Sequence, residues 1–177
     1  MRYAIPYTGL TSVENSCHSI TEILRNHADI PYTIIYLVEN QKDGFAKRAR
    51  LEATTFDNGL VRVKKADGNE EYIYIHGQSS RDIPDYLLKT PDVIVMPNSE
   101  EDIVPVDTYS TSASPWPVER AIYSGTDITI RLSDDSLAVL YPVTSIIGGK
   151  DKLTAVMIYG INPHRALDED YKKFLRV

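Results

Sequence analysis

Residue types that could carry out catalysis or bind a metal are few and lie far apart along the chain. The four histidines are His18, His27, His76 and His164, and Cys17 is the only cysteine. A zinc site needs three or four nitrogen or sulfur ligands that converge, and no pair of these residues has the spacing of a zinc motif. The sequence therefore predicts neither catalytic residues nor a metal site.

Two short polar motifs are better explained by backbone structure than by chemistry. Gly148-Gly149-Lys150 lacks the two spaced glycines and the Lys-Ser/Thr pair of a phosphate-binding loop, so it predicts a hairpin turn. The acidic residues 168–170 could bind a cation or act as acid and base. They also suit the first turn of a helix, where the helix dipole favours negative charge, and we favour that interpretation.

Composition limits the class of protein and the class of partner. The chain has 177 residues, of which 42% are hydrophobic, and a formal net charge of −6. These values suit one globular domain without a basic surface for nucleic acid. One cysteine cannot form a disulfide within the chain, and no apolar stretch approaches the ~20 residues that cross a bilayer. We expect a cytoplasmic protein that binds no nucleic acid and does not insert into a membrane.

The first element that positions side chains is a predicted helix near the N-terminus. Its apolar stripe at helical spacing comprises Val13, Cys17, Ile20, Leu24 and His27. Thr11 and Glu14 fit a capping box at its start, and Pro31 is expected to end it. Cys17 then lies among apolar side chains, as a small residue of the core rather than a reactive thiol.

Two hairpins are predicted to follow this helix. Residues 32–38 and 48–55 predict an antiparallel pair, in which Ala49, Leu51 and Ala53 share one face of the second strand. Residues 60–64 and 72–75 predict a second hairpin that turns near Asp67-Gly68.

A second group of strands is predicted in the C-terminal part. Residues 126–132, 137–147 and 153–161 predict an antiparallel meander, and a helical stripe follows from Leu167. Strands and helices do not alternate regularly along the chain. The predicted fold class is therefore α+β with an antiparallel sheet, rather than α/β with a parallel one.

The middle of the chain, residues 77–124, is the least regular part. It contains six of the ten prolines and the only tryptophan, and short helices fit at residues 83–89 and 118–124. Long irregular segments within a compact domain are often lids or binding loops. We therefore expect a ligand to bind here.

Several segments, in this order along the chain, resemble the secondary-structure elements of GAF domains. They are residues 29–37 (DIPYTIIYL), 49–54 (ARLEAT), 137–143 (LAVLYPV), and 155–165 with 167–175 (AVMIYGINPHR and LDEDYKKFL). The last of these is most similar to GAF domains of fungal and bacterial hybrid histidine kinases. The resemblance implies a central antiparallel sheet of about six strands, with helices on one face and loops and short helices over the other.

The resemblance also implies a domain organisation and a function. Residues 1–177 would form a single GAF domain, with residues 1–10 as an N-terminal extension and residues 77–124 as the lid or pocket region. Residues 166–177 would begin a helix that couples the domain to a histidine kinase output domain in the same chain. Residues 60–75 match no segment of the family that we can place, and whether they are an insertion stays open.

By analogy with the place where GAF domains bind ligands, five residues are candidates for the walls of a small-molecule pocket. They are Tyr36, Trp116, Arg120, Tyr123 and Tyr141. The alternative for each aromatic residue is a place in the core or on a sheet face, and for Arg120 it is the solvated surface. The identity of the ligand stays open.

Two ligand classes known in the family are not expected. The signature of cyclic-nucleotide GAF domains is only partial, because Leu167 stands where phenylalanine is usual. Cys17-His18 has the residue pair that attaches a bilin, but the pair lies on the first helix. No covalent bilin and no metal cofactor are therefore expected.

The sequence leaves three functions open, in descending order of preference. The first is a sensory domain that binds a small molecule or a partner and signals through its flanking helices. The second is a ligand-free GAF domain that serves dimerisation and signal transmission, although this chain alone is expected to be a monomer or a weak homodimer. The third is a small free-standing enzyme that reduces methionine sulfoxide, for which the single Cys17 is insufficient.

Overall fold

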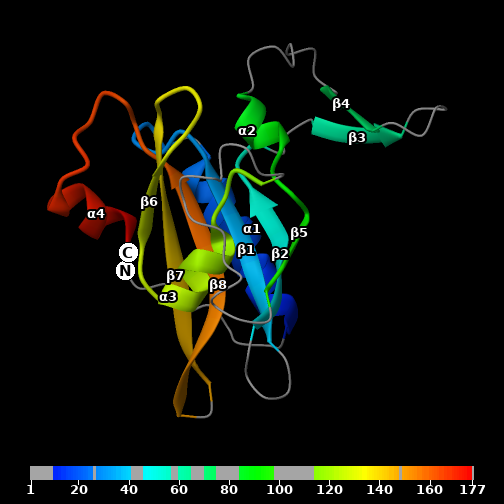
Figure 1. Cartoon of the computed structure of the whole chain (residues 1–177), viewed down its shortest axis with the longest axis vertical. Helices are drawn as coiled ribbons and strands as arrows, with labels where there is room; N and C mark the ends of the chain where they lie inside the picture. The colour runs from blue at the N-terminus through cyan, green and yellow to red at the C-terminus, as the bar shows by residue number, and fades with distance from the viewer. Residues whose placement is uncertain are drawn as a thin grey trace.

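The computed structural model describes residues 10–25, 27–40, 46–56, 60–64, 70–74, 84–97, 114–147 and 149–176. This described part contains helices and strands in a mixed order (Figure 1). The helices are α1 (Leu10–Leu24), α2 (Asp85–Leu88), α3 (Val118–Ser124) and α4 (Glu169–Leu175). The strands are β1 (Thr33–Asn40), β2 (Ala46–Thr54), β3 (Leu60–Lys64), β4 (Glu70–Tyr74), β5 (Val93–Val95), β6 (Ile128–Arg131), β7 (Leu137–Ile147) and β8 (Lys150–Gly160).

Six of these strands form one antiparallel sheet, in the order β5-β2-β1-β8-β7-β6. The two longest strands, β7 and β8, pair as a hairpin, and β8 also pairs with β1, so that Thr33 lies opposite Tyr159. The antiparallel α+β sheet predicted from the sequence is therefore confirmed. β3 and β4 pair only with each other, in a separate two-stranded sheet, and the expected turn between them lies outside the described residues.

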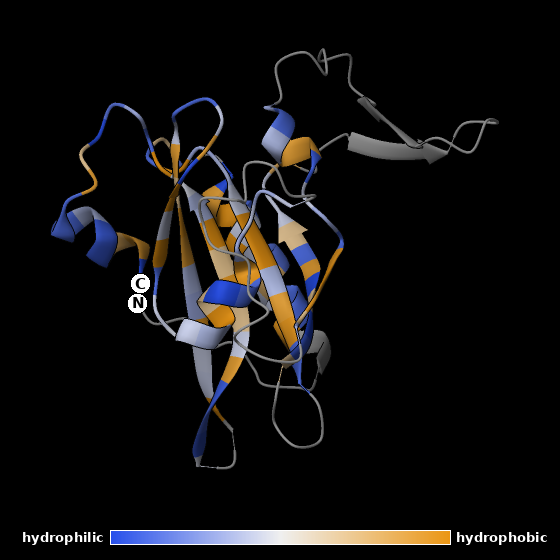
Figure 2. Cartoon of the chain, viewed as in Figure 1, coloured by the Kyte–Doolittle hydropathy of each residue, from blue (hydrophilic) through white to orange (hydrophobic). Residues whose placement is uncertain are grey.

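Successive side chains of a strand point to opposite faces of the sheet, so the apolar central strands place apolar side chains on both faces. On β1, Ile34 and Tyr36 belong to the large cluster that includes Val118 and Ala121 of α3, whereas Ile35 packs with Cys17 of α1. The side chains that α4 buries pack on the same face as α1. Figure 1 shows α1 behind the sheet and α3 in front of it, and Figure 2 shows apolar residues concentrated on the central strands.

A β-bulge in β2 contradicts the alternation predicted for that strand. The register with β1 shifts between Ile35 and Tyr36, whose partners are Ala53 and Leu51. As a result Ala49 joins the cluster under α3, while Ala53 joins the cluster of Cys17 under α1. The expectation that Ala49, Leu51 and Ala53 share one face is therefore wrong for Ala53, because the extra residue of a bulge reverses the alternation.

The ends of α1 also differ from the prediction. The helix begins at Leu10, so Thr11 lies inside it and is not the cap. It ends at Leu24, well before Pro31, and the chain then turns: the His27 N–H donates to the Leu24 carbonyl at 3.0 Å, and the Ile30 N–H donates to the His27 carbonyl at 3.2 Å. Cys17 is buried, which confirms its place in the core.

The closing helix begins as its acidic residues predict. The Asp168 carboxylate caps α4 by accepting a hydrogen bond from the Tyr171 N–H at 2.8 Å, and Glu169 and Asp170 occupy the first turn. In the middle of the chain, α3 has the predicted bounds, α2 is shorter than expected, and the short edge strand β5 was missed. Residues 77–83 and 98–113 of the expected lid region lie outside the described residues.

Candidate functional site

The five candidate pocket residues lie on two faces of the sheet. Tyr36 and Trp116 have no exposed surface and belong to the cluster under α3. Arg120 and Tyr123 lie on α3 itself and are partly exposed. Tyr141 is buried on the opposite face, in the cluster that includes α4. The structure therefore brings Tyr36, Trp116 and α3 together but separates Tyr141 from them.

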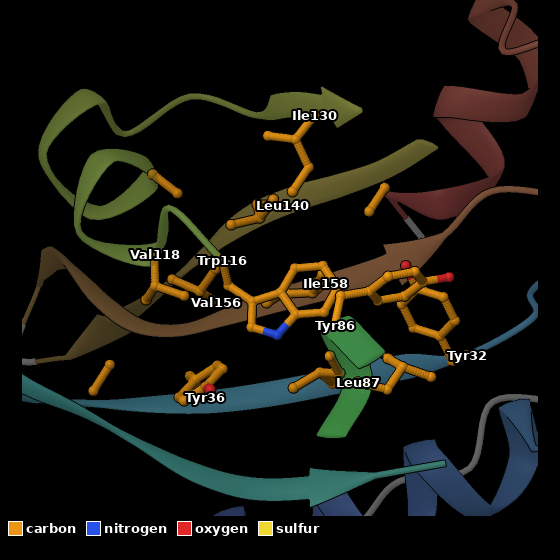
Figure 3. Close-up of a cluster of buried hydrophobic side chains, with 14 of the residues drawn as sticks. Tyr32, Tyr36, Tyr86, Leu87, Trp116, Val118, Ile130, Leu140, Val156 and Ile158 are labelled. Atoms are coloured by element: carbon orange, nitrogen blue, oxygen red, sulfur yellow. The ribbon is translucent and has the colours of Figure 1, made fainter. Parts of the chain in front are cut away.

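An aromatic cluster fills the space between the sheet and the segment around α2. The ring centroids of Tyr32, Tyr86 and Trp116 lie 6.0 to 6.1 Å from one another, and the Tyr86 and Trp116 rings meet edge to face. Figure 3 shows the indole of Trp116 against Ile158 and beside Tyr86. Gly160 makes this packing possible, because a Cβ there would lie 2.5 Å from the Tyr32 ring. Tyr36 and Trp116 are thus residues of the hydrophobic core, and their contact with a ligand stays a prediction.

The polar atoms of these aromatic side chains hold the segment of residues 90–97 in place. The Trp116 indole N–H donates to the Thr90 hydroxyl at 2.8 Å. The Tyr36 and Tyr123 hydroxyls donate to the carbonyls of Pro91 and Pro97, at 2.7 and 2.6 Å. A buried aromatic residue with a polar atom normally finds such a partner. This explains why part of the proline-rich middle is ordered against the sheet and α3.

One carboxylate lies beside the aromatic cluster, in the turn between β6 and β7. Burial alone would raise the pKa of Asp134, but hydrogen bonds from Ser136 and from the Tyr86 hydroxyl lower the pKa below its ordinary value. The Tyr86 hydroxyl donates to Asp134 Oδ2 at 3.1 Å. The carboxylate is therefore held in its charged form as a hydrogen-bond acceptor, which is the wrong state for a general acid.

A group of charged side chains around the buried Glu52 connects α1 to the bulge of β2. The Glu52 side chain is only 6% exposed, and its carboxylate lies 2.8 Å from Arg50 Nη1 and 3.5 Å from His18 Nε2. Arg50 also contacts Glu14 of α1 at 3.0 Å. The contacts of His18 and Glu14 tie the helix to the strand, and the Arg50 guanidinium lies against the buried carboxylate, so we interpret these contacts as structural.

The buried phenols and the thiol predict a loss of stability at alkaline pH. Burial raises the pKa of Cys17 to about 11 and that of Tyr159 to about 12, and it also raises the pKa of Tyr32 and Tyr36. The unfolded chain releases these protons near the ordinary values of 9.0 and 10.0, whereas the folded chain retains them. The stabilisation is therefore complete below pH 9, and the free energy of unfolding should fall as the pH rises above it.

Urea titrations between pH 8 and pH 11 measure this loss. The variant Cys17→Ala removes the thiol contribution and should retain the part of the loss that belongs to the tyrosines, which begins about one pH unit higher. A free energy of unfolding that stays constant from pH 8 to pH 11 would contradict the prediction.

An apolar cavity of about 640 Å3 lies on the other face of the sheet, between α1, α4 and the strands β7 and β8. Its lining is mostly hydrocarbon and aromatic and consists of Ile20, Ile23, Leu24, Ile30, Tyr141, Pro142, Val143, Thr144, Met157, Tyr159, Phe174, Leu175 and Arg176. Of the five candidate pocket residues, Tyr141 alone lines it. The sequence predicted a ligand in the proline-rich middle, which stays a prediction, and gave no indication of this cavity beyond Tyr141. Ile23 could have indicated the cavity, because it is an apolar residue next to the helical stripe and widens the apolar surface of the helix there.

The described residues lack both a metal-binding cluster and a membrane-spanning helix. They contain no group of three or more histidine, cysteine, aspartate or glutamate side chains that could hold a metal ion. No helix in this part of the chain has the length and apolar composition needed to cross a membrane. Comparison of the chain with protein-family models, curated proteins and solved structures finds no match.

Proposed function

We propose that this chain is a regulatory domain of the GAF type, which binds a small molecule and passes the signal through its end helices to an output domain, for which a histidine kinase is the candidate. The six-stranded antiparallel sheet, with long helix α1 on one face and short helices on the other, agrees with what the sequence resemblance implies. Fold alone does not assign a function, so the proposal needs an observation at a site.

The observation that carries the proposal is the joint packing of the first and last helices. Side chains of α1 and α4 line the same cavity, although the two helices lie at opposite ends of the chain. Met157 of β8 packs against both the Cys17 cluster under α1 and the Tyr171 cluster under α4. A ligand that changes the packing at this point would act on both end helices at once. A ligand changes this packing only if it binds one arrangement of the helices better than another.

A thermal-shift screen combined with hydrogen exchange tests the proposal. The compounds are purines, haem, aromatic metabolites and cyclic nucleotides. Cyclic nucleotides should raise the melting temperature least, because the cyclic-nucleotide signature is incomplete at Leu167. A ligand at 100 times its Kd stabilises a domain of this size by roughly 2.7 kcal/mol, or about 7 °C. The same ligand should change the amide protection of α1 or α4. The proposal fails if bound ligands leave the exchange of both helices unchanged.

A second function, that of a ligand-free dimerisation module, is favoured by one observation. Ile23 of α1 and Phe174 of α4 are 75% and 40% exposed, and both lie at the cavity. Exposed apolar side chains on neighbouring helices suit a contact with a second copy. Light scattering over a concentration series separates the two functions, because the module requires a stable dimer and the sensory domain does not.

A further inference from the structure

We propose that the cavity between α1 and α4 binds an uncharged, largely apolar small molecule. This inference deepens the proposed function and rests on it for the regulatory effect of the ligand, but not for binding itself. The site lies on the sheet face opposite to α3, and therefore away from Tyr36, Trp116 and the segment around Pro91.

The size of the cavity suits a small organic molecule. Its volume of about 640 Å3 falls within the range of roughly 300–1,000 Å3 that is usual for ligand pockets. Tyr141 and Tyr159, whose rings lie 5.9 Å apart, come from the two central strands of the cavity wall. Ile20 and Leu24 of α1 and Leu175 of α4 add branched aliphatic walls. Covering these apolar surfaces with an apolar ligand removes them from water, which makes binding favourable.

The charges near the cavity favour a neutral ligand. Arg176 is the one charged side chain among the described residues that line it, and its Nη2 lies 3.0 Å from Asp127 Oδ1. Glu169, on the first turn of α4, is paired with Lys172 at 3.1 Å. A charged ligand would lose its hydration without gaining an unpaired partner of opposite charge, which is costly. A neutral apolar ligand pays no such cost.

The shape of the site favours a small molecule over a second copy of the chain. A two-fold interface brings the same patch of both copies together. Ile23 and Phe174 both lie at the cavity, so a symmetric contact through them would place one hollow against another. Two facing hollows would leave apolar walls without contacts, and the atoms that line such a void lose van der Waals attraction. A molecule of the size of the cavity fills it without that loss.

The test uses the neutral fluorophore N-phenyl-1-naphthylamine, whose emission rises in an apolar environment. We expect saturable binding to the whole chain and displacement by 1-decanol. Decanoate and decylammonium, which carry a charge on a chain of the same length, should compete at least about tenfold more weakly. Equal competition by either ion would overturn the argument from charge.

Three tryptophan variants locate the binding site. Thr144→Trp and Ile23→Trp place a large side chain at exposed positions that line the cavity, and each should weaken fluorophore binding at least about tenfold. The matched control Val95→Trp changes an exposed residue of β5, at the opposite edge of the sheet from β6, and should bind normally. Two cavity positions are used so that the loss of one variant to misfolding leaves the test intact.

Each outcome has a definite meaning. Absence of saturable binding, or normal binding by both folded cavity variants, overturns the inference. Light scattering that shows a dimer dissociated by the fluorophore identifies a second copy as the natural occupant and also overturns it. Failure of the proposed function gives a different result from failure of ligand binding. In that case the fluorophore binds and the cavity variants block it, while hydrogen exchange in α1 and α4 is unaffected.

Discussion

Replacement of Trp116 with alanine is expected to lower the free energy of unfolding by about 3–5 kcal/mol, as for other buried aromatic residues. The indole has no exposed surface, packs against the rings of Tyr32 and Tyr86, and donates a hydrogen bond to Thr90. The variant would leave a cavity at the centre of the cluster and remove the hydrogen bond that the Thr90 hydroxyl accepts, while that hydroxyl still donates to the Tyr86 carbonyl at 3.4 Å. Urea denaturation at pH 7 measures the change.

Two variants separate the volume of Trp116 from its hydrogen bond. Trp116→Phe keeps an aromatic ring but removes the indole N–H, and Thr90→Val removes the acceptor. Each should cost less than the alanine variant, and a buried hydrogen bond typically contributes about 0.5–1.5 kcal/mol. If Trp116→Ala costs less than about 1 kcal/mol, which is far below the usual range, the assignment of Trp116 to the core is wrong.

Replacement of Tyr171 with alanine is expected to destabilise α4 and to cost about 3 kcal/mol or more. Tyr171 has no exposed surface and packs in the cluster with Val139 and Tyr159, and its hydroxyl donates to the Asp29 carbonyl. α4 is a short helix, and short helices depend on tertiary packing for their stability. Removal of its main buried side chain should therefore release it from the sheet.

Hydrogen exchange measures this effect element by element. In Tyr171→Ala the amides of α4 should lose protection more than those of β1 and β8. Phe174→Ala is the matched control, because Phe174 lies on the same helix, stacks on Tyr171 and is partly exposed. It should cost clearly less. Equal losses in the two variants would show that Tyr171 does not anchor the helix.

Much of the fold could be predicted from local patterns. The run of residues 32–38 and the long apolar segments 137–147 and 153–161 predicted β1, β7 and β8, because each is rich in β-branched and aromatic residues. The acidic residues before Tyr171 predicted the start of α4, because a helix N-terminus favours negative charge. These signals lie within a few residues of the element that they specify.

The errors have a different physical origin. The bulge opposite Ile35 depends on pairing between strands, so the sequence of β2 alone could not show that Ala53 faces α1. The helix α1 ends at Leu24, and local backbone hydrogen bonds turn the chain before the proline is reached, which the apolar stripe alone did not indicate. The short strand β5 forms because β2 offers it a pairing edge, and three residues carry too little periodicity to be recognised.

The sequence by itself determined the class of the fold, the central strands and the buried place of Cys17. Hydrophobic periodicity and composition are sufficient for these properties, because they depend on residue type and short spacing. Tertiary structure alone decided that Tyr36 and Trp116 pack in the core while Tyr141 lines a cavity on the opposite face. It also decided that this cavity lies between the first and last helices. Its walls come from residues more than 100 positions apart, such as Ile20 and Tyr141, and only the assembled sheet brings them together.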